Sequence, residues 1–395
     1  MDQRTRARVA CGGIVAVFVL VQVGALALVG PFDRAGYQAV EDPQNPTNSL
    51  VYLGVILVAT AVMLAIIKLG VDQLLRALLV GAGAYIALFV FRVILPPVVT
   101  VPVGGAAVHL LAWGLAGLLG VALWVYPEWY VIDAAGVVMG IGAAGMFGIS
   151  FGVLPALLLL TVLAVYDAIS VYGTEHMLTL ASGVMEMKVP IVLVVPLSLS
   201  YSYLDADTPD PVAEDEDADT DAGTDADDDA VSDAETDAVP DADAGTGGDA
   251  DVAVDVAATA NGGSPSDADP VRSDPGEADA ETSAGADAEG DFDRDALFIG
   301  LGDAVIPTVL VASAAFFAPE PVPTVDVLGL SAALPAWTAM VGTVAGLVVL
   351  LWMVLKGRAH AGLPLLNGGT IAGYLVGALA AGLSLARALG VEGLL

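Results

Sequence analysis

Cysteine, histidine and lysine are nearly absent from this chain. Its 395 residues include one cysteine, Cys11, three lysines and three histidines. A single cysteine excludes an internal disulfide and argues against thiol redox chemistry. The histidines, His109, His176 and His360, stand in different segments, and no H-E-x-x-H motif occurs, which argues against a zinc protease. We therefore expect neither a metal nor an organic cofactor.

Charge is scarce outside one segment. Residues 205–295 hold 32 of the 46 acidic residues and only two arginines, so most of the net charge of −33 arises there. The segment has few aromatic residues and scattered Pro, Gly, Ser and Thr, and such a composition cannot bury enough apolar surface to fold. We predict that residues 205–294 form a disordered acidic cytoplasmic loop between residues 1–204 and 295–395, with an acidic recruitment segment as the alternative. The dense acid and the low lysine content suggest a halophilic organism.

The rest of the chain is too apolar for a soluble protein. Hydrophobic residues make up 56% of the sequence, and several runs approach the roughly 20 residues that a membrane-spanning helix needs. These runs are continuous rather than alternating, which favours helices over barrel strands. We predict an all-α polytopic membrane protein with nine transmembrane helices. The predicted helices are Val9–Val29 (a signal peptide is the alternative), Leu50–Ile67, Leu74–Leu95, Val101–Tyr126, Val131–Ile149, Val153–Gly173, Ala296–Phe317, Leu334–Leu355 and Leu363–Leu389.

The basic residues predict an orientation for this chain. Cytoplasmic loops carry an excess of Lys and Arg. With a cytoplasmic N-terminus, ten basic residues lie inside and only Arg34, Arg92 and Arg387 lie outside. We predict an integral protein of the cell membrane with its N-terminus in the cytoplasm and its C-terminus outside. Its partners are then the lipid bilayer and other membrane proteins or peptides, and no nucleic acid.

Two acidic residues lie well inside predicted helices, Asp167 in Val153–Gly173 and Asp303 in Ala296–Phe317. A carboxylate in a membrane span costs roughly 2.5–3.5 kcal/mol, so such a residue marks a functional site with a partner. Counted from the cytoplasmic ends of their helices, Asp167 and Asp303 lie roughly 9 and 10 Å deep, so we expect them to face each other. Two adjacent carboxylates share one proton and titrate as a coupled pair. The charged member can activate a water while the protonated member binds a peptide carbonyl, which is aspartic proteolysis.

A transporter or channel is the alternative function, because paired acids in a membrane also carry protons or bind cations. That function predicts polar positions spread across the membrane depth. The two acids at one level, with little else beside them, favour hydrolysis.

Three short motifs resemble those of a known family. Tyr166-Asp167, Gly300-Leu301-Gly302-Asp303 and Ala361-Gly362-Leu363-Pro364 are similar to the Tyr-Asp, Gly-x-Gly-Asp and Pro-Ala-Leu-Pro motifs of the presenilin and signal-peptide-peptidase intramembrane aspartyl proteases. The last motif departs from the family, since only its Leu-Pro pair is kept. The resemblance implies a presenilin-like fold of archaeal type, Asp167 and Asp303 as catalytic residues, and transmembrane proteins as substrates.

The other motif residues have expected supporting roles. Gly300 should lie on the helical face of Asp303 and leave space beside it, while Gly302 loosens the helix. Leu301 lies between them in the motif. Tyr166 is expected either to hydrogen-bond near the aspartates or to pack in the interior. Gly362, Leu363 and Pro364 are expected to position the substrate, because an unwound entry at Leu363-Pro364 would leave backbone groups free to pair with an extended chain. The alternative is that Pro364 simply opens the last helix, where a missing N–H does no harm.

Three further segments carry weaker expectations. His176–Leu199 is apolar but broken by charges and prolines, so it predicts a short amphipathic helix or an interfacial strand. The G-x-G-x-x-G pattern at Gly140–Gly145 lies inside a predicted span, which favours helix packing over dinucleotide binding. Four acidic residues lie near span ends and are expected to be solvated caps: Asp72, Glu128, Asp133 and Glu175.

Overall fold

The computed structural model describes residues 3–103, 106–173, 192–198, 201–202, 204, 296–327, 329–356 and 361–392. The described residues are mostly helical, and their long helices are α1 (Gln3–Arg34), α2 (Thr47–Lys68), α3 (Asp72–Ile94), α4 (Leu110–Val125), α5 (Trp129–Ser150), α6 (Val153–Gly173), α8 (Leu301–Phe316), α9 (Leu334–Val354) and α10 (Gly362–Ala380). A short helix, α11 (Leu385–Ala388), follows α10. The predicted acidic loop and residues 176–191 lie outside the described residues.

Five of these helices are long and apolar enough to cross a membrane, namely α1, α3, α5, α9 and α10. The apolar parts of α2, α4, α6 and α8 are shorter, at 10–17 residues. The prediction of a helical, polytopic membrane protein is therefore confirmed, while a count of nine crossings stays a prediction.

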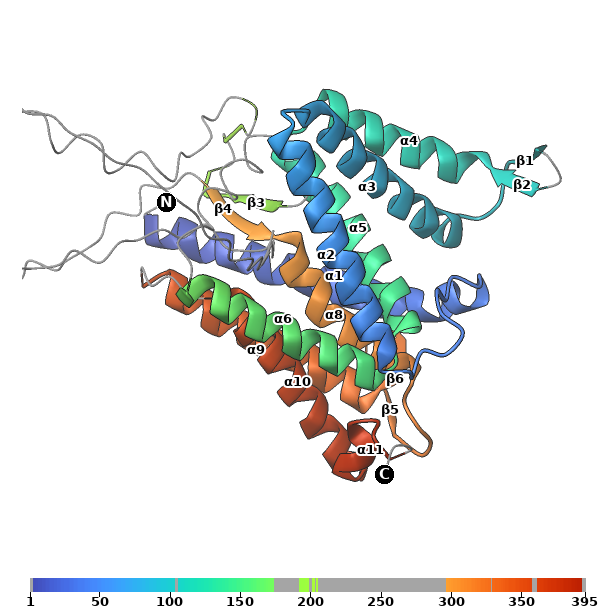
Figure 1. Cartoon of the computed structure of the whole chain (residues 1–395), viewed down its shortest axis with the longest axis vertical. Helices are drawn as coiled ribbons and strands as arrows, with labels where there is room; N and C mark the ends of the chain where they lie inside the picture. The colour runs from blue at the N-terminus through green and yellow to red at the C-terminus, as the bar shows by residue number, and fades with distance from the viewer. Residues whose placement is uncertain are drawn as a thin grey trace, which may run out of the picture.

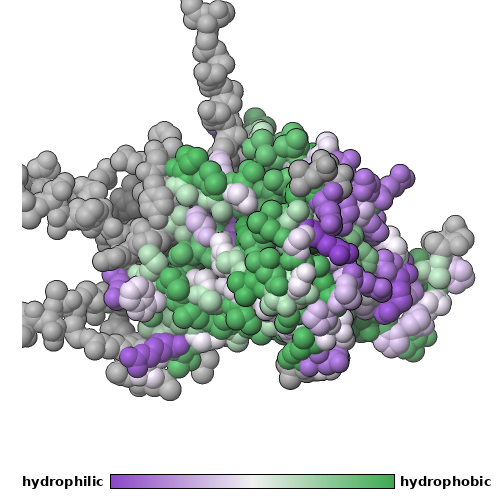
Figure 2. Space-filling model, turned by 90° about the horizontal axis from the view of Figure 1, so that it is seen from below, coloured by the Kyte–Doolittle hydropathy of each residue, from purple (hydrophilic) through white to green (hydrophobic). Residues whose placement is uncertain are grey.

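Large apolar side chains cover much of the outer surface. Figure 2 shows hydrophobic residues over most of one face, with most polar residues at the right of the view and a smaller group at the lower left. Examples are Val58 on α2 and Val341 on α9, which are 64% and 65% exposed, and Trp352 on α9 at 56%. A soluble monomer rarely exposes apolar patches of this extent, so this surface is suited to contact with lipid.

Helix α8 lies in the interior of the bundle. It contacts α1, α5, α6, α9 and α10, and Figure 1 shows it running between α6 and α5. Of its 16 residues, eleven are buried. The helix that begins beside Asp303 is therefore enclosed by protein on most sides.

Small residues let the helices approach each other closely. In α9 and α10, the most extensive helix pair, a Cβ on Gly342 or Gly369 would collide with the backbone of the partner helix. In α5, a Cβ on Gly142 would meet Ile86 and Val90 of α3, and one on Gly145 would meet Phe32 of α1. The expectation that the Gly140–Gly145 pattern serves helix packing is confirmed.

Three two-stranded antiparallel sheets lie between the helices. They pair β1 (Thr100–Val103) with β2 (Ala106–His109), β3 (Val192–Pro196) with β4 (Ala296–Gly300), and β5 (Thr324–Val327) with β6 (Leu330–Ala333). The first hairpin corrects the predicted helix Val101–Tyr126, which begins only at Leu110. Its β-branched residues, with Pro102 lacking an N–H, favour a strand over a first helical turn. In the segment His176–Leu199, residues 192–196 form a strand, as one of the two alternatives predicted.

The last predicted helix, Leu363–Leu389, is also divided. α10 ends at Ala380, and Gly382 adopts a φ of +85°, a conformation that glycine tolerates best. The chain then turns into α11, where the Ser384 hydroxyl accepts a hydrogen bond from the Arg387 N–H.

Candidate active site

Asp167 lies on α6 with its side chain buried, at 1% exposure. Its Oδ2 accepts a hydrogen bond of 2.9 Å from the backbone N–H of Leu363. Leu363 is the second residue of α10, and the first N–H groups of a helix have no acceptor within the helix. The carboxylate therefore takes up a donor that the helix cannot use, and the bond fixes α6 to the start of α10.

Asp303 lies in the first turn of α8 and is fully buried, at 0% exposure. Next to it is Gly362, the first residue of α10. A Cβ placed on Gly362 would lie 3.6 Å from Oδ2 of Asp303 and 3.5 Å from Leu350. The absence of a side chain at Gly362 keeps that space beside the carboxylate open.

The two aspartates thus meet at the same place. Leu363 holds Asp167 and its neighbour Gly362 borders Asp303, so both carboxylates lie against two consecutive residues of α10. Asp303 lies in the first turn of α8, and the Asp167 carboxylate lies against the N-terminus of α10. The backbone N–H groups at a helix N-terminus favour negative charge. The result is a buried pair of acids, contributed by α6 and α8 and gathered by α10.

Two expectations about local structure were wrong. Asp303 is not in mid-helix, because residues 296–300 form β4 and Gly300 is the N-cap of α8 rather than a turn of it. The start of α10 is not unwound either, because the helix includes Gly362, Leu363 and Pro364. Pro364 fits a first helical turn, where its missing N–H is not needed.

The remaining predicted residues are sequence neighbours of the two aspartates. The side chain of Leu301 packs against α5, where a Cβ on Gly140 would lie 3.4 Å from it. Gly302 is half-buried in the first turn of α8, and Tyr166 is half-buried on α6 beside Asp167. Leu301 is therefore an anchor for the start of α8.

Polar contacts inside the bundle support the positions of α6 and α10. Asn367, one turn after Leu363 on α10, donates from Nδ2 to the carbonyl oxygen of Leu160 on α6, at 3.0 Å. Thr343 of α9 and Thr370 of α10 share a buried hydrogen bond of 2.7 Å. Such bonds between helices hold in a bilayer, where few competing partners exist.

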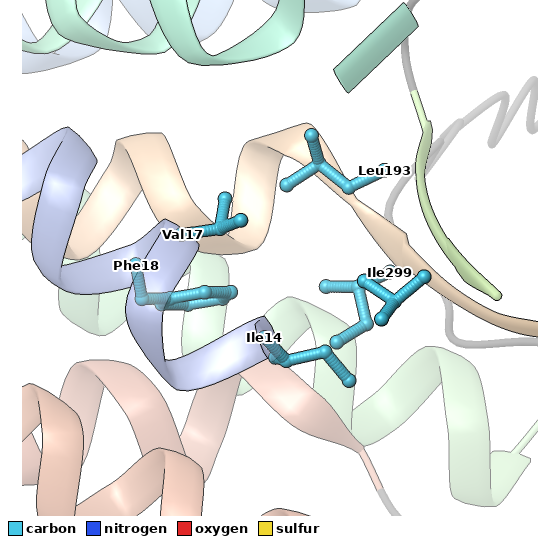
Figure 3. Close-up of a pocket in the computed structure, with 6 residues that line it drawn as sticks. Ile14, Val17, Phe18, Leu193 and Ile299 are labelled. Atoms are coloured by element: carbon cyan, nitrogen blue, oxygen red, sulfur yellow. The ribbon is translucent and has the colours of Figure 1, made fainter. Parts of the chain in front are cut away.

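A small sheet leads into Asp303. In the β3–β4 sheet, Val192 pairs with Gly300 and Leu193 with Ile299, and β4 continues directly into α8. Figure 3 shows an apolar pocket between this sheet and α1, where Leu193 and Ile299 face Ile14 and Phe18. The sheet therefore packs on α1 and sets where α8 begins.

Two acidic residues outside the predicted site also proved to be structural rather than solvated caps. Asp133 on α5 accepts a hydrogen bond of 2.8 Å from the N–H of Val194 in β3. Glu128, only 6% exposed, accepts one of 2.7 Å from the Ser202 hydroxyl. The sequence feature that could have indicated this role for Asp133 is its position inside a predicted transmembrane helix. Asp72 and Glu175 have no described side chains.

The described residues contain no group of three or more His, Cys, Asp and Glu side chains suited to a metal ion. Asp167 and Asp303 both lie against the start of α10.

Comparison with known proteins agrees with this arrangement. The sequence profile described as signal-peptide peptidase, presenilin aspartyl protease matches residues 15–224 and 274–383. Two solved structures of a presenilin family intramembrane aspartate protease, in C222 and P2 space groups, are similar. They share 26% and 27% identity, with TM-scores of 0.53 and 0.51. The first match covers 94% of this chain and 99% of the other, and the second 93% and 97%. No curated protein sequence matches significantly.

The family match and the similar solved structures define the class of this protein as an intramembrane aspartic protease. The chain belongs to the signal-peptide peptidase and presenilin family of aspartyl proteases. It is an integral membrane protein and an aspartic-type endopeptidase whose substrates are membrane proteins within the bilayer. The presenilin-like fold and the function predicted from the motifs are confirmed, and the transporter alternative gains no support.

Proposed function

We propose that Asp167 and Asp303 are the catalytic residues of this protease and act as one coupled pair. The observation that carries the proposal is the contact of both carboxylates with consecutive residues at the start of α10. Because Leu363 binds one and Gly362 borders the other, a rigid helix start holds them close together. Two carboxylates at that range share a proton, so one can act as a base while the other acts as an acid.

In the proposed reaction, the ionised member takes a proton from a water as that water attacks the carbonyl carbon of the substrate. The protonated member donates its proton to the carbonyl oxygen, which gives a neutral tetrahedral diol. The carboxyl that took the proton from the water then gives it to the nitrogen as the C–N bond breaks, and the other carboxylate takes a proton from a diol hydroxyl. A carboxylic acid and an amine are released, and the pair again holds one proton. The reaction consumes one water and needs no metal or organic cofactor.

Surrounding residues have supporting roles in this proposal. The N–H of Leu363 orients the Asp167 carboxylate. Gly362 leaves room beside Asp303 for water or for the substrate backbone, and Pro364 holds the first turn of α10 in helical geometry. Leu301 anchors the start of α8, and Tyr166 with Gly302 lines the region next to the aspartates.

The test is cleavage of a transmembrane peptide by the purified protein in detergent. Asp167→Asn and Asp303→Asn keep the size of the side chain but cannot exchange the proton, so each is expected to abolish cleavage. Asp326→Asn, an exposed position on β5, is the matched control and should retain full activity. Cleavage that survives either of the first two substitutions refutes the assignment.

We also propose that the N-terminus is cytoplasmic and the C-terminus lies outside, from the distribution of basic residues. In a Cys11→Ser background, a cysteine at Thr5 or Glu392 can be labelled with a membrane-impermeant maleimide on intact cells. Glu392→Cys is expected to react and Thr5→Cys to react only after lysis. The opposite pattern overturns the orientation.

A further inference from the structure

Strand β3 lies between α5 and the strand that leads to Asp303. Its partner β4 runs into α8 without a loop, and Asp303 follows Gly300 by three residues. Val192 pairs with Gly300 at this end of the sheet. A displacement of β3 is therefore transmitted through β4 to the start of α8, where the carboxylate of Asp303 is placed.

The outer edge of β3 is fixed by an acidic side chain. Oδ1 of Asp133 accepts the Val194 N–H at 2.8 Å. That N–H therefore points away from β4. Val194 and Phe298 face each other as a non-hydrogen-bonded pair, the kind that alternates with hydrogen-bonded pairs in every antiparallel sheet. Asp133 thus satisfies an edge N–H that the sheet itself cannot.

The same helix holds the chain at a second point. Glu128, which precedes the first turn of α5, accepts the hydroxyl of Ser202, eight residues after Val194. The side chain of Val194 packs in one apolar cluster with Ile132 and Ala135 of α5. Helix α5 therefore secures both β3 and the segment that follows it.

We propose that Asp133 is a positioning residue of this protease. Its carboxylate fixes the register and depth of β3 on α5, and through β4 it sets the position of Asp303 relative to Asp167. The contact of Glu128 with Ser202 supports the same placement. Asp133 acts through backbone rather than on substrate, and the inference rests on the proposed roles of Asp167 and Asp303.

The first test separates hydrogen bonding from charge. Asp133→Ala removes the acceptor, whereas Asp133→Asn keeps an oxygen that can accept the Val194 N–H. Loss of one buried hydrogen bond predicts about a tenfold lower kcat for Asp133→Ala, with little change in KM because no substrate contact is lost. Asp133→Asn is expected to stay within about threefold of the wild type, since its amide oxygen accepts the same bond. Equal losses for both variants, or full activity of Asp133→Ala, overturn the proposal.

The second test removes the donor instead. Val194→Pro deletes the N–H that bonds Asp133 but no ladder bond to β4, because that N–H faces α5. It is expected to reproduce the loss seen in Asp133→Ala, and the double variant should be no worse than either single one. Losses that multiply show that the two groups act independently and refute the proposal.

A readout that does not depend on catalysis completes the design. Hydrogen–deuterium exchange of peptides covering residues 192–196 and 296–300 is expected to be faster in Asp133→Ala than in Asp133→Asn or the wild type. Unchanged exchange in Asp133→Ala overturns the anchoring. Cleavage by Asp303→Asn would instead show that the proposed catalytic pair is wrong, so the two failures are distinguishable.

Discussion

Replacing Leu363 by proline removes one hydrogen-bond donor from the active site. The Leu363 N–H donates to Oδ2 of Asp167 at 2.9 Å and lies in the first turn of α10, where the helix itself has no use for it. Proline is tolerated in a first helical turn, so α10 should still form. The expected consequence is a misoriented Asp167 in an otherwise intact protein.

The size of the effect follows from the kind of bond. A hydrogen bond to a charged group contributes about 1.5–3 kcal/mol. At 1.36 kcal/mol per factor of ten, removal of this bond lowers kcat/KM by roughly 10- to 150-fold. The loss is expected because the Asp167 carboxylate must keep this orientation to act with Asp303.

Leu363→Ala is the matched control, because it also truncates the buried leucine but keeps the N–H. Both variants are assayed for peptide cleavage in detergent, and their thermal unfolding midpoints are compared. The ratio of their kcat/KM values isolates the hydrogen bond from the loss of packing. A Leu363→Pro protein that is folded and as active as Leu363→Ala would refute the role assigned to this bond.

Two other substitutions on α10 test the packing around the site. Gly369→Ala places a Cβ against the backbone of Gly342 on α9 and should lower the unfolding midpoint by several degrees. A Cβ on the adjacent Gly368 meets nothing within 4 Å. Gly368→Ala should therefore be neutral or stabilising by up to about 1 kcal/mol. Equal midpoints for the two variants would contradict the close helix contact. Asn367→Leu removes the hydrogen bond to the Leu160 carbonyl on α6. Such a bond contributes about 0.6 kcal/mol in a membrane, so we expect a kcat about threefold lower. Unchanged kinetics would show that this bond does not position Asp167.

Local sequence was sufficient to predict the class of protein. Continuous apolar runs leave no choice but helices in a bilayer, since every backbone group must find its partner within the chain. The two acids inside those runs, Asp167 and Asp303, stood out because an isolated carboxylate there is costly. Their short motifs then indicated the family to which the chain belongs.

The starts of the helices depended on contacts that are distant in sequence. Residues 296–300 are apolar and fit either a helix or a strand by pattern alone. Pairing with Val192–Pro196, about a hundred residues earlier, makes them β4 and moves the start of α8 to Leu301. The predicted helix start at Ala296 was wrong for this reason.

The tertiary structure also decided which groups serve the carboxylates. The backbone N–H of Leu363 carries no sequence signature, yet it holds Asp167 from 196 residues away. Asp133 was expected to be a solvated cap, because only the fold places β3 against it. Composition and hydropathy are properties of single segments and can be interpreted locally, whereas these bonds exist only after the helices have packed.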